Sequence, residues 1–339
     1  MRRLLRRYGA AALGVAVIAG IFGFALPRIA SYRDVIDVVS GLEGWSIVAL
    51  TLATVWNVLT FAPPWRAAVP GLGLWRALLM TQASTATASA MPGGEAVGLG
   101  LVFGMLRTWG FQRTAIVAAV AVVTALNTLA KVLLPVAALV ALLVTGHQTG
   151  LLGLATVVGV VAVSLLLGAA IAAFRTDAST RAFGARLDRR LVRIPLLRRL
   201  TVSGPLGERL RHFRAETIGL LRRRWLSLSL WTLVGHTSVF LVLIVSLRAV
   251  GVGSEDVDFV EAFAAWTLTR LLTAVPITPG GIGFVELGLT GALVAAGGEN
   301  DAVVAAVLLY RLLTWLPPIL LGAPAAVFWR RLHPVTPAR

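Results

Sequence analysis

Long apolar runs separated by short polar segments dominate the pattern of this chain. Crossing a hydrocarbon core of about 30 Å takes about 20 residues of helix. Apolar runs of that length cover residues 8–26, 44–62, 114–146, 149–174, 225–249 and 302–328. We therefore expect an all-α polytopic membrane protein with about six full transmembrane helices.

Two further stretches, 77–106 and 262–297, are apolar overall but broken near their middles by the sequence Pro-Gly-Gly. Proline lacks an amide N–H, and glycine adopts backbone angles that helices do not use. A helix is therefore expected to end at each break. Each stretch predicts two short helices joined at membrane depth.

The first apolar run follows the basic segment Met-Arg-Arg-Leu-Leu-Arg-Arg, which resembles the start of a signal peptide. However, the uncharged run is long for a signal peptide, and Phe-Ala-Leu-Pro at its end is a poor cleavage site. We expect residues 8–26 to form an uncleaved signal anchor.

The arginines are unevenly distributed among the connecting segments, and this distribution predicts the orientation of the chain in the membrane. Cytoplasmic segments collect Lys and Arg, and residues 175–224 contain 14 Arg against four acidic residues. With that loop inside, both termini are cytoplasmic. Both flanks of 77–106 then carry arginines, whereas both flanks of 262–297 carry acidic residues. Each broken stretch is therefore expected to return to its own side as a re-entrant helical hairpin.

Composition narrows the class further. Apolar residues make up 58% of the chain and charged residues 14%, against about 45–50% and about 25% in soluble domains, which excludes a soluble enzyme. The net charge of +16 is explained by topology, so nucleic acid is not expected as a partner. The absence of cysteine excludes disulfides and thiolate metal sites.

The sequence contains no His-x-x-Glu-His, serine-elbow or phosphate-loop motif. Asp256-Val-Asp258 mimics the metal-binding Asp-x-Asp of sugar-nucleotide transferases, but the topology places it outside, away from cytoplasmic nucleotide sugars. We therefore expect no catalytic residue, metal or cofactor. The expected location is the inner (plasma) membrane. The whole chain, 1–339, is read as a single integral membrane domain.

The two Pro-Gly-Gly breaks, at Pro92 and Pro279, lie 187 positions apart, and the same offset places Gly110 on Gly297. The first broken stretch enters from inside and the second from outside. Each unit would consist of a span, a hairpin and a second span. Many transporters contain two such units, the second inverted in the membrane relative to the first. We expect a first repeat at 44–146 and an inverted second repeat at 225–328. Two unrelated Pro-Gly kinks in ordinary helices are the alternative.

Ionisable residues at membrane depth are costly and are functional candidates by default. The backbone freed at the breaks needs a polar lining, and a helix that begins there directs its positive end to the midplane, where an anion can sit. The candidate site residues are Glu95, Arg270, Glu286 and Arg311, with Gly93, Gly94, Gly280 and Gly281, and with His236, Lys131, Asn57 and Asn127 as secondary members. Salt bridges that merely lock the hairpins are the alternative.

The residues around the breaks resemble the transmembrane region of lysylphosphatidylglycerol synthases, a family also described as flippase-like. The resemblance rests on Ser-Ala-Met-Pro-Gly-Gly at 89–94, on Pro-Gly-Gly-Ile-Gly-Phe-Val-Glu at 279–286, and on Tyr-Arg-Leu at 310–312. It covers about residues 10–330 and implies a role in moving lipids between leaflets. Because no residues follow Arg339, the aminoacyl-transferase activity that often accompanies this region is not expected.

We expect a lipid transporter, not an enzyme, that moves an anionic or aminoacylated phospholipid, or another lipid-linked phosphate, through a midplane cavity. Arg270 and Arg311 would contact the phosphate, since arginine offers a planar set of donors. Glu286 and Glu95 would orient those arginines or meet a cationic headgroup. The alternatives are a membrane-embedded transferase on a lipid-linked substrate and a non-catalytic partner of a separate lipid synthase.

The Arg-rich loop 175–224 has amphipathic pieces suited to anionic lipid at the cytoplasmic surface. Membrane phospholipids are therefore the expected partners. A loop that only sets the topology is the alternative.

Overall fold

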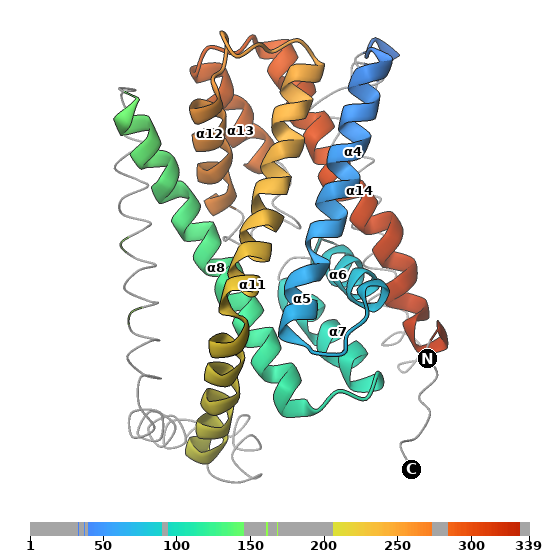
Figure 1. Ribbon diagram of the computed structural model, residues 1–339. Helices are drawn as coiled ribbons and strands as arrows, with labels where there is room; N and C mark the ends of the chain where they lie inside the picture. The colour runs from blue at the N-terminus through green and yellow to red at the C-terminus, as the bar shows by residue number, and fades with distance from the viewer. Residues whose placement is uncertain are drawn as a thin grey trace, which may run out of the picture.

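The computed structural model describes residues 33, 37, 40–89, 94–145, 161, 168, 206–272 and 284–332 (Figure 1). The elements are helices: α4 (Gly44–Thr60), α5 (Ala62–Ala68), α6 (Leu74–Ser89), α7 (Gly94–Thr108), α8 (Arg113–Val144), α11 (Leu206–Ala249), α12 (Phe259–Leu272), α13 (Phe284–Ala295) and α14 (Asn300–Leu332). No strand occurs among these residues. The all-α prediction is confirmed.

Four predicted spans are found as long apolar helices in the described part of the chain: Gly44–Ala68, Arg113–Val144, Phe213–Ala249 and Asn300–Trp329. Their outer faces carry large exposed apolar side chains such as Trp45, Leu52 and Leu143, which suits contact with lipid. The chain is therefore an integral membrane protein. The predicted spans 8–26 and 149–174 lie outside the described residues, so the count of six stays a prediction.

Helix α11 begins well before the predicted span at residue 225. Residues 206–224, assigned to the Arg-rich loop, instead continue the membrane helix toward its N-terminus. Leu, Arg and Glu favour helix, and Leu220 and Leu221 pack against a buried apolar cluster, so the helix begins before residue 225. Residues 175–205 of the loop lie outside the described part.

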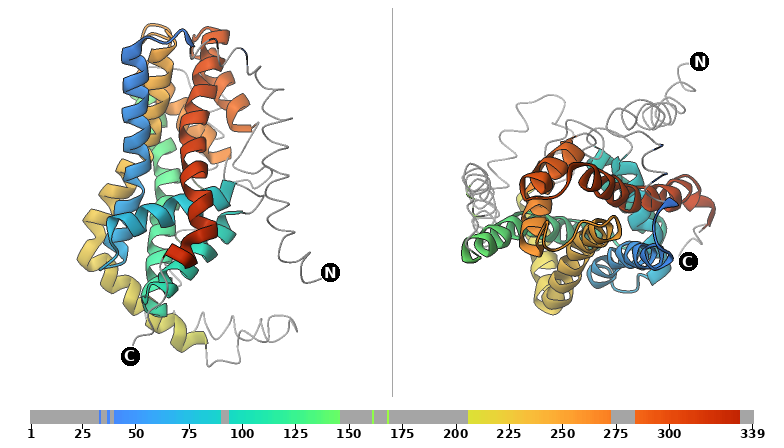
Figure 2. Two further views of the ribbon diagram at one scale, coloured as in Figure 1. Left: turned by 90° about the vertical axis from the view of Figure 1, so that its right-hand side faces the viewer. Right: turned by 90° about the horizontal axis from the view of Figure 1, so that it is seen from above.

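The two broken stretches form helix pairs at opposite ends of the bundle. Helix α6 begins and α7 ends in the lower half of Figure 1, whereas α12 begins and α13 ends at its upper end. Figure 2 shows the same separation from the side. The breaks themselves, at 90–93 and 273–283, lie outside the described residues.

The helices α7 and α13 end in the same way. Gly110 and Gly297 adopt positive φ angles of 88° and 121°. In the residue after each glycine, the N–H bonds back to the carbonyl five residues earlier, from Phe111 to Leu106 and from Gly298 to Leu293. This is the Schellman ending of a helix. The two turns lie 187 positions apart, as do the first residues of α8 and α14.

Each helix pair has its own apolar core. The first core surrounds α6 and α7 and includes Met80, Met105 and Ile116. The second surrounds α12 and α13 and includes Leu243, Trp266 and Leu289. Helix α14 contributes to both, with Val307 near its start in the second core and Trp329 near its end in the first. Arg311, which is considered next, therefore sits on a helix that links the two cores.

Candidate functional site

Glu286 and Arg311 form a buried ion pair. The Arg311 Nε donates to Glu286 Oε1 over 2.6 Å, and the two side chains are only 15% and 3% exposed. Glu286 lies in the first turn of α13, where a carboxylate is favoured by the helix dipole, and Arg311 lies on α14. The pair joins the second hairpin to the long helix that follows it.

Arg270 lies in the last turn of α12, and its guanidinium stacks over the ring of Trp266, 4.9 Å from the ring centroid. Trp266 in turn donates from Nε1 to the hydroxyl of Tyr310 over 3.2 Å. Both aromatic side chains are buried. Because Tyr310 precedes Arg311, this chain of contacts brings the two arginines into electrostatic range of one another.

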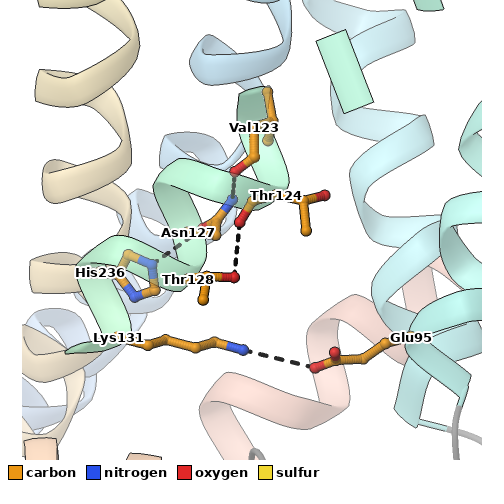
Figure 3. Close-up of polar contacts among 7 residues, drawn as sticks. All are labelled: Glu95, Val123, Thr124, Asn127, Thr128, Lys131 and His236. Carbon is orange, nitrogen blue, oxygen red and sulfur yellow. Dashed lines mark hydrogen bonds and ion pairs between the residues drawn. The ribbon is translucent and has the colours of Figure 1, made fainter. Parts of the chain in front are cut away.

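Glu95, in the first turn of α7, faces Lys131 on α8 (Figure 3). The Lys131 Nζ lies 3.7 Å from Glu95 Oε1, and the Glu95 side chain is 77% exposed. We expected Glu95 to orient an arginine or to meet a cationic headgroup, and the ion pair found here is with Lys131. The reason is geometric, because α7 packs against α8 while Arg311 is engaged by Glu286.

His236 on α11 reaches the same face of α8. Its Nε2 lies 3.1 Å from Asn127 Oδ1, and Asn127 Nδ2 donates to the carbonyl of Val123 over 2.9 Å. In Figure 3, Asn127 and Lys131 lie one turn apart on α8, together with Thr124 and Thr128. Lys131 and Arg270 are both within electrostatic range of His236.

Asn57 belongs to a separate network. Its Nδ2 donates to Ser238 Oγ over 2.9 Å, and Ser238 also lies 2.9 Å from the hydroxyl of Thr60. These buried contacts join α4 to α11. None of these three residues is charged, and the hydrogen bonds described for the Asn57 side chain do not reach the ion pairs.

Of the predicted glycines, Gly94 is described and Gly93, Gly280 and Gly281 lie outside the described residues. A Cβ on Gly94 would come within 2.5 Å of the carbonyl oxygen of Ala88, which is too close for a real side chain. Gly94 therefore allows α7 to start directly against the end of α6.

From the sequence, Trp266 was not assigned to the site, and Tyr310 was named only as part of the Tyr-Arg-Leu motif. A signal was present for each, since Trp266 is four residues before Arg270, one helical turn away on the same face, and Tyr310 is next to Arg311. An aromatic residue in an apolar span is common, however, and the sequence alone does not show which arginine a ring supports.

Among the described side chains of this cluster, Lys131, Arg270 and Arg311 are cationic and Glu95 and Glu286 are carboxylates. Arg270 lies in electrostatic range of both Lys131 and Arg311, and cations gathered in this way suit the cluster to an anion. In the described parts of the chain, no group of three or more His, Asp or Glu side chains is placed to hold a metal ion.

A helical bundle with exposed apolar faces and a charged interior cluster defines a polytopic membrane protein with a polar internal site. The chain belongs to the lysylphosphatidylglycerol synthase TM region family, whose model matches residues 11–322. A search of curated proteins gave no match.

Proposed function

We propose that this protein binds the phosphate of a lipid headgroup at the interior cluster and moves the lipid between leaflets. Arg270 and Arg311 contact the phosphate, and Glu286 fixes the orientation of Arg311. Lys131 and Glu95 form the second, more accessible edge of the site. The role is transport without catalysis, on an anionic or aminoacylated phospholipid or another lipid-linked phosphate that a separate lipid synthase supplies.

The observation that carries this proposal is that Lys131, Arg270 and Arg311 gather within a membrane protein, with Arg270 in electrostatic range of both others. Cationic side chains at membrane depth are costly and mark substrate paths, and three that lie close together favour an anion between them. A lipid phosphate is the anion that the membrane itself offers. The family is named for synthases of a phospholipid, which agrees with this choice.

Six full transmembrane helices with two re-entrant hairpins, arranged as an inverted repeat, form the scaffold of this proposal. Three observations support the repeat: the α6–α7 and α12–α13 pairs lie at opposite ends of the bundle, the Schellman turns recur 187 positions apart, and α8 and α14 begin 187 positions apart. Such repeats let a central site open to either side in turn.

The inner (plasma) membrane is the proposed location, with both termini cytoplasmic. Arginines gather on elements at the lower end of Figure 1, namely Arg66, Arg76, Arg107, Arg113, Arg214, Arg222, Arg223 and Arg224. Acidic residues gather at the upper end, and Arg248 there donates to the carbonyls of Val252 and Val257 in the segment that follows α11. The positive-inside rule assigns the arginine-rich end to the cytoplasm, where the first part of α11 meets anionic lipid.

A leaflet-resolved assay in proteoliposomes tests the proposal. Phospholipids labelled on an acyl chain are bleached from the outer leaflet, and the rate at which inner-leaflet label becomes accessible is measured. We expect the parent to exceed protein-free vesicles and Arg270→Gln to lose most of that rate. Arg113→Gln is the matched control, because Arg113 is exposed at the start of α8 and far from the cluster. Equal rates for Arg270→Gln and the parent would contradict the proposal.

A further inference from the structure

The long apolar helices α4–α5, α8, α11 and α14 each run from one apolar core to the other (Figure 1). Their buried residues nearest the boundary are Ala62, Val123, Leu228 and Ala325 in the first core, and Ala53, Leu134, Val239 and Tyr310 in the second. The segments between them, 54–61, 124–133, 229–238 and 311–324, form what we call the middle layer. These segments connect two separately packed halves, one around each hairpin.

Each segment of the middle layer contains a weak point in its helix. A proline removes the helix bond to the carbonyl four residues earlier, and the prolines of these helices act on carbonyls of the middle layer. They are Pro63 and Pro64 at the start of α5, Pro135 in α8, and Pro317, Pro318 and Pro324 in α14. In α11 the segment contains Gly235, and glycine weakens a helix interior. All four connections are therefore weakened between the cores.

The weak points lie at one level of the bundle. A single cavity is lined by Phe61 at the end of α4, by Asn127 of α8 and by Gly235 of α11. In α14, Gly322 lies so close to α6 that a Cβ there would overlap the carbonyl oxygen of Gln82. The Gln82 side chain in turn donates to a carbonyl in the last turn of α4. The four segments therefore form one layer across the bundle.

Polar contacts and a cavity, not close apolar packing, occupy this layer. Asn57 of α4 bonds to Ser238 of α11, and Asn127 of α8 bonds to His236 of α11. Thr232 also lines the cavity, and its buried hydroxyl makes no hydrogen bond within the described part of the chain. Close-packed cores move as units, because their side chains interdigitate with few voids. A layer with a cavity and weakened helices allows the two cores to move against one another.

We propose that the middle layer is a hinge about which the half containing the first hairpin rotates against the half containing the second. The inference goes beyond the proposed function, because it concerns a motion of the protein and not the molecule that the protein moves. Glu286 and Arg311 both belong to elements of the second half and stay together. Glu95 belongs to the first hairpin and Lys131 to the middle layer, so the contact between them changes as the hinge bends.

Spin labels measure the motion, and the absence of cysteine from the chain leaves only introduced sites to label. Gln112→Cys with Asn300→Cys places one label on each half, at exposed positions where α8 and α14 begin. Ser254→Cys with Asn300→Cys is the control pair, since both exposed positions lie in the second half. Distances are measured by pulsed electron paramagnetic resonance in lipid nanodiscs. We expect two distances that differ by more than about 2 Å for the first pair, and one distance for the control pair.

Stiffened helices locate the hinge. A Cβ on Gly235 meets its nearest atom at 3.6 Å, so Gly235→Ala fits, and it should reduce the population of the second distance about fivefold. Pro317→Ala with Pro318→Ala restores two helix bonds and should abolish the second distance. Both changes favour helix, so both variants are expected to fold. The matched control is Gly100→Ala in α7, where a Cβ meets no described atom within 4 Å, and it should retain both distances.

The outcomes distinguish the hinge from the proposed function. A single distance for the first pair in the parent overturns the hinge. Two distances that persist in both stiffened variants also overturn it, as does an equal loss of the second distance in Gly100→Ala and Gly235→Ala. Lipid movement in proteoliposomes is measured in parallel. Two distances in a parent that moves no lipid support the hinge and contradict the transport function.

Discussion

The ion pairs that follow the two helix breaks differ in how tightly the protein holds them. Glu286 and Arg311 are buried and in direct hydrogen-bond contact, whereas Glu95 is largely exposed and lies farther from Lys131. A buried ion pair stays in contact because no water competes for its charged groups, whereas the groups of an exposed pair exchange their partner for water. The second hairpin is therefore the anchored half of the site, and the first hairpin supplies the contact that opens most readily.

The two hairpins also differ in how their helices pack, and here the first hairpin has the closer contact between backbones. Helix α7 approaches the backbone of α6 through small residues, and a Cβ on Gly98 would come within 2.7 Å of the Ser84 carbonyl oxygen. Helix α13 instead buries the large side chains of Leu289 and Leu293. The first hairpin thus depends on close backbone contact, and the second depends on side chains and a buried charge pair.

The largest expected effect on stability comes from removing the carboxylate of one ion pair while its cation stays in place. Glu286→Gln leaves the Arg311 charge buried without its carboxylate and should cost about 3–5 kcal/mol in the free energy of unfolding. The matched change Glu95→Gln should cost about 0–1 kcal/mol, since that carboxylate is exposed. Denaturant unfolding in detergent measures both, and equal losses would remove the distinction between the two pairs.

Glycine substitutions test whether the two hairpins differ in how closely their helix backbones pack. Gly98→Ala places a methyl group against the α6 backbone and should cost about 1–3 kcal/mol, as overpacking does. Gly291→Ala in the second hairpin meets nothing within 4 Å and should stabilise its helix by about 0.5–1 kcal/mol. Unfolding midpoints compared with the parent give both values. A neutral Gly98→Ala would show that the first hairpin is not limited by close backbone contact.

The smallest expected effect concerns the equivalent starts of α8 and α14. Glu299 accepts from the N–H groups of Ala302 and Asp301, and these bonds hold the pKa of the Glu299 carboxyl below its ordinary value. Gln112, 187 positions earlier, makes no such side-chain bond at the start of α8. The Glu299 carboxylate therefore stabilises the fold above its ordinary pKa, and this contribution is lost as the pH falls through the lowered folded-state pKa.

Hydrogen exchange at the first turns of α8 and α14 measures this difference. Acidification should increase exchange at the start of α14 more than at the start of α8, and Glu299→Gln should abolish the excess. If acidification still increases exchange at the start of α14 in Glu299→Gln, a group other than Glu299 causes the increase.

Much of the fold could be predicted from the sequence because hydropathy and helix breakers act locally. The four described spans and the two broken stretches follow from the apolar runs and from Pro-Gly-Gly. The length of α11 did not follow, since the packing of Leu220 and Leu221 depends on distant helices. The candidate charges were found from their cost in a membrane.

The pairing within the site was only half predictable. Glu286 stands out beside a break, and Arg311 stands out within an apolar span. That Glu95 meets Lys131 depends on the height at which α7 rests against α8, which glycine contacts with α6 determine. The support of Arg270 by Trp266 and Tyr310 likewise depends on how α12 meets α14, and no local pattern encodes that meeting.

The double variant Arg311→Met with Glu286→Leu tests whether the buried ion pair belongs to the path of the lipid. Replacing a buried ion pair by apolar residues of similar size is often neutral for stability. The measurement is the leaflet-resolved rate of lipid movement in proteoliposomes, taken together with thermal stability in detergent. We predict that the double variant inserts and unfolds like the parent but no longer moves lipid. A stable double variant that moves lipid at the parental rate would show instead that the pair is only a structural brace.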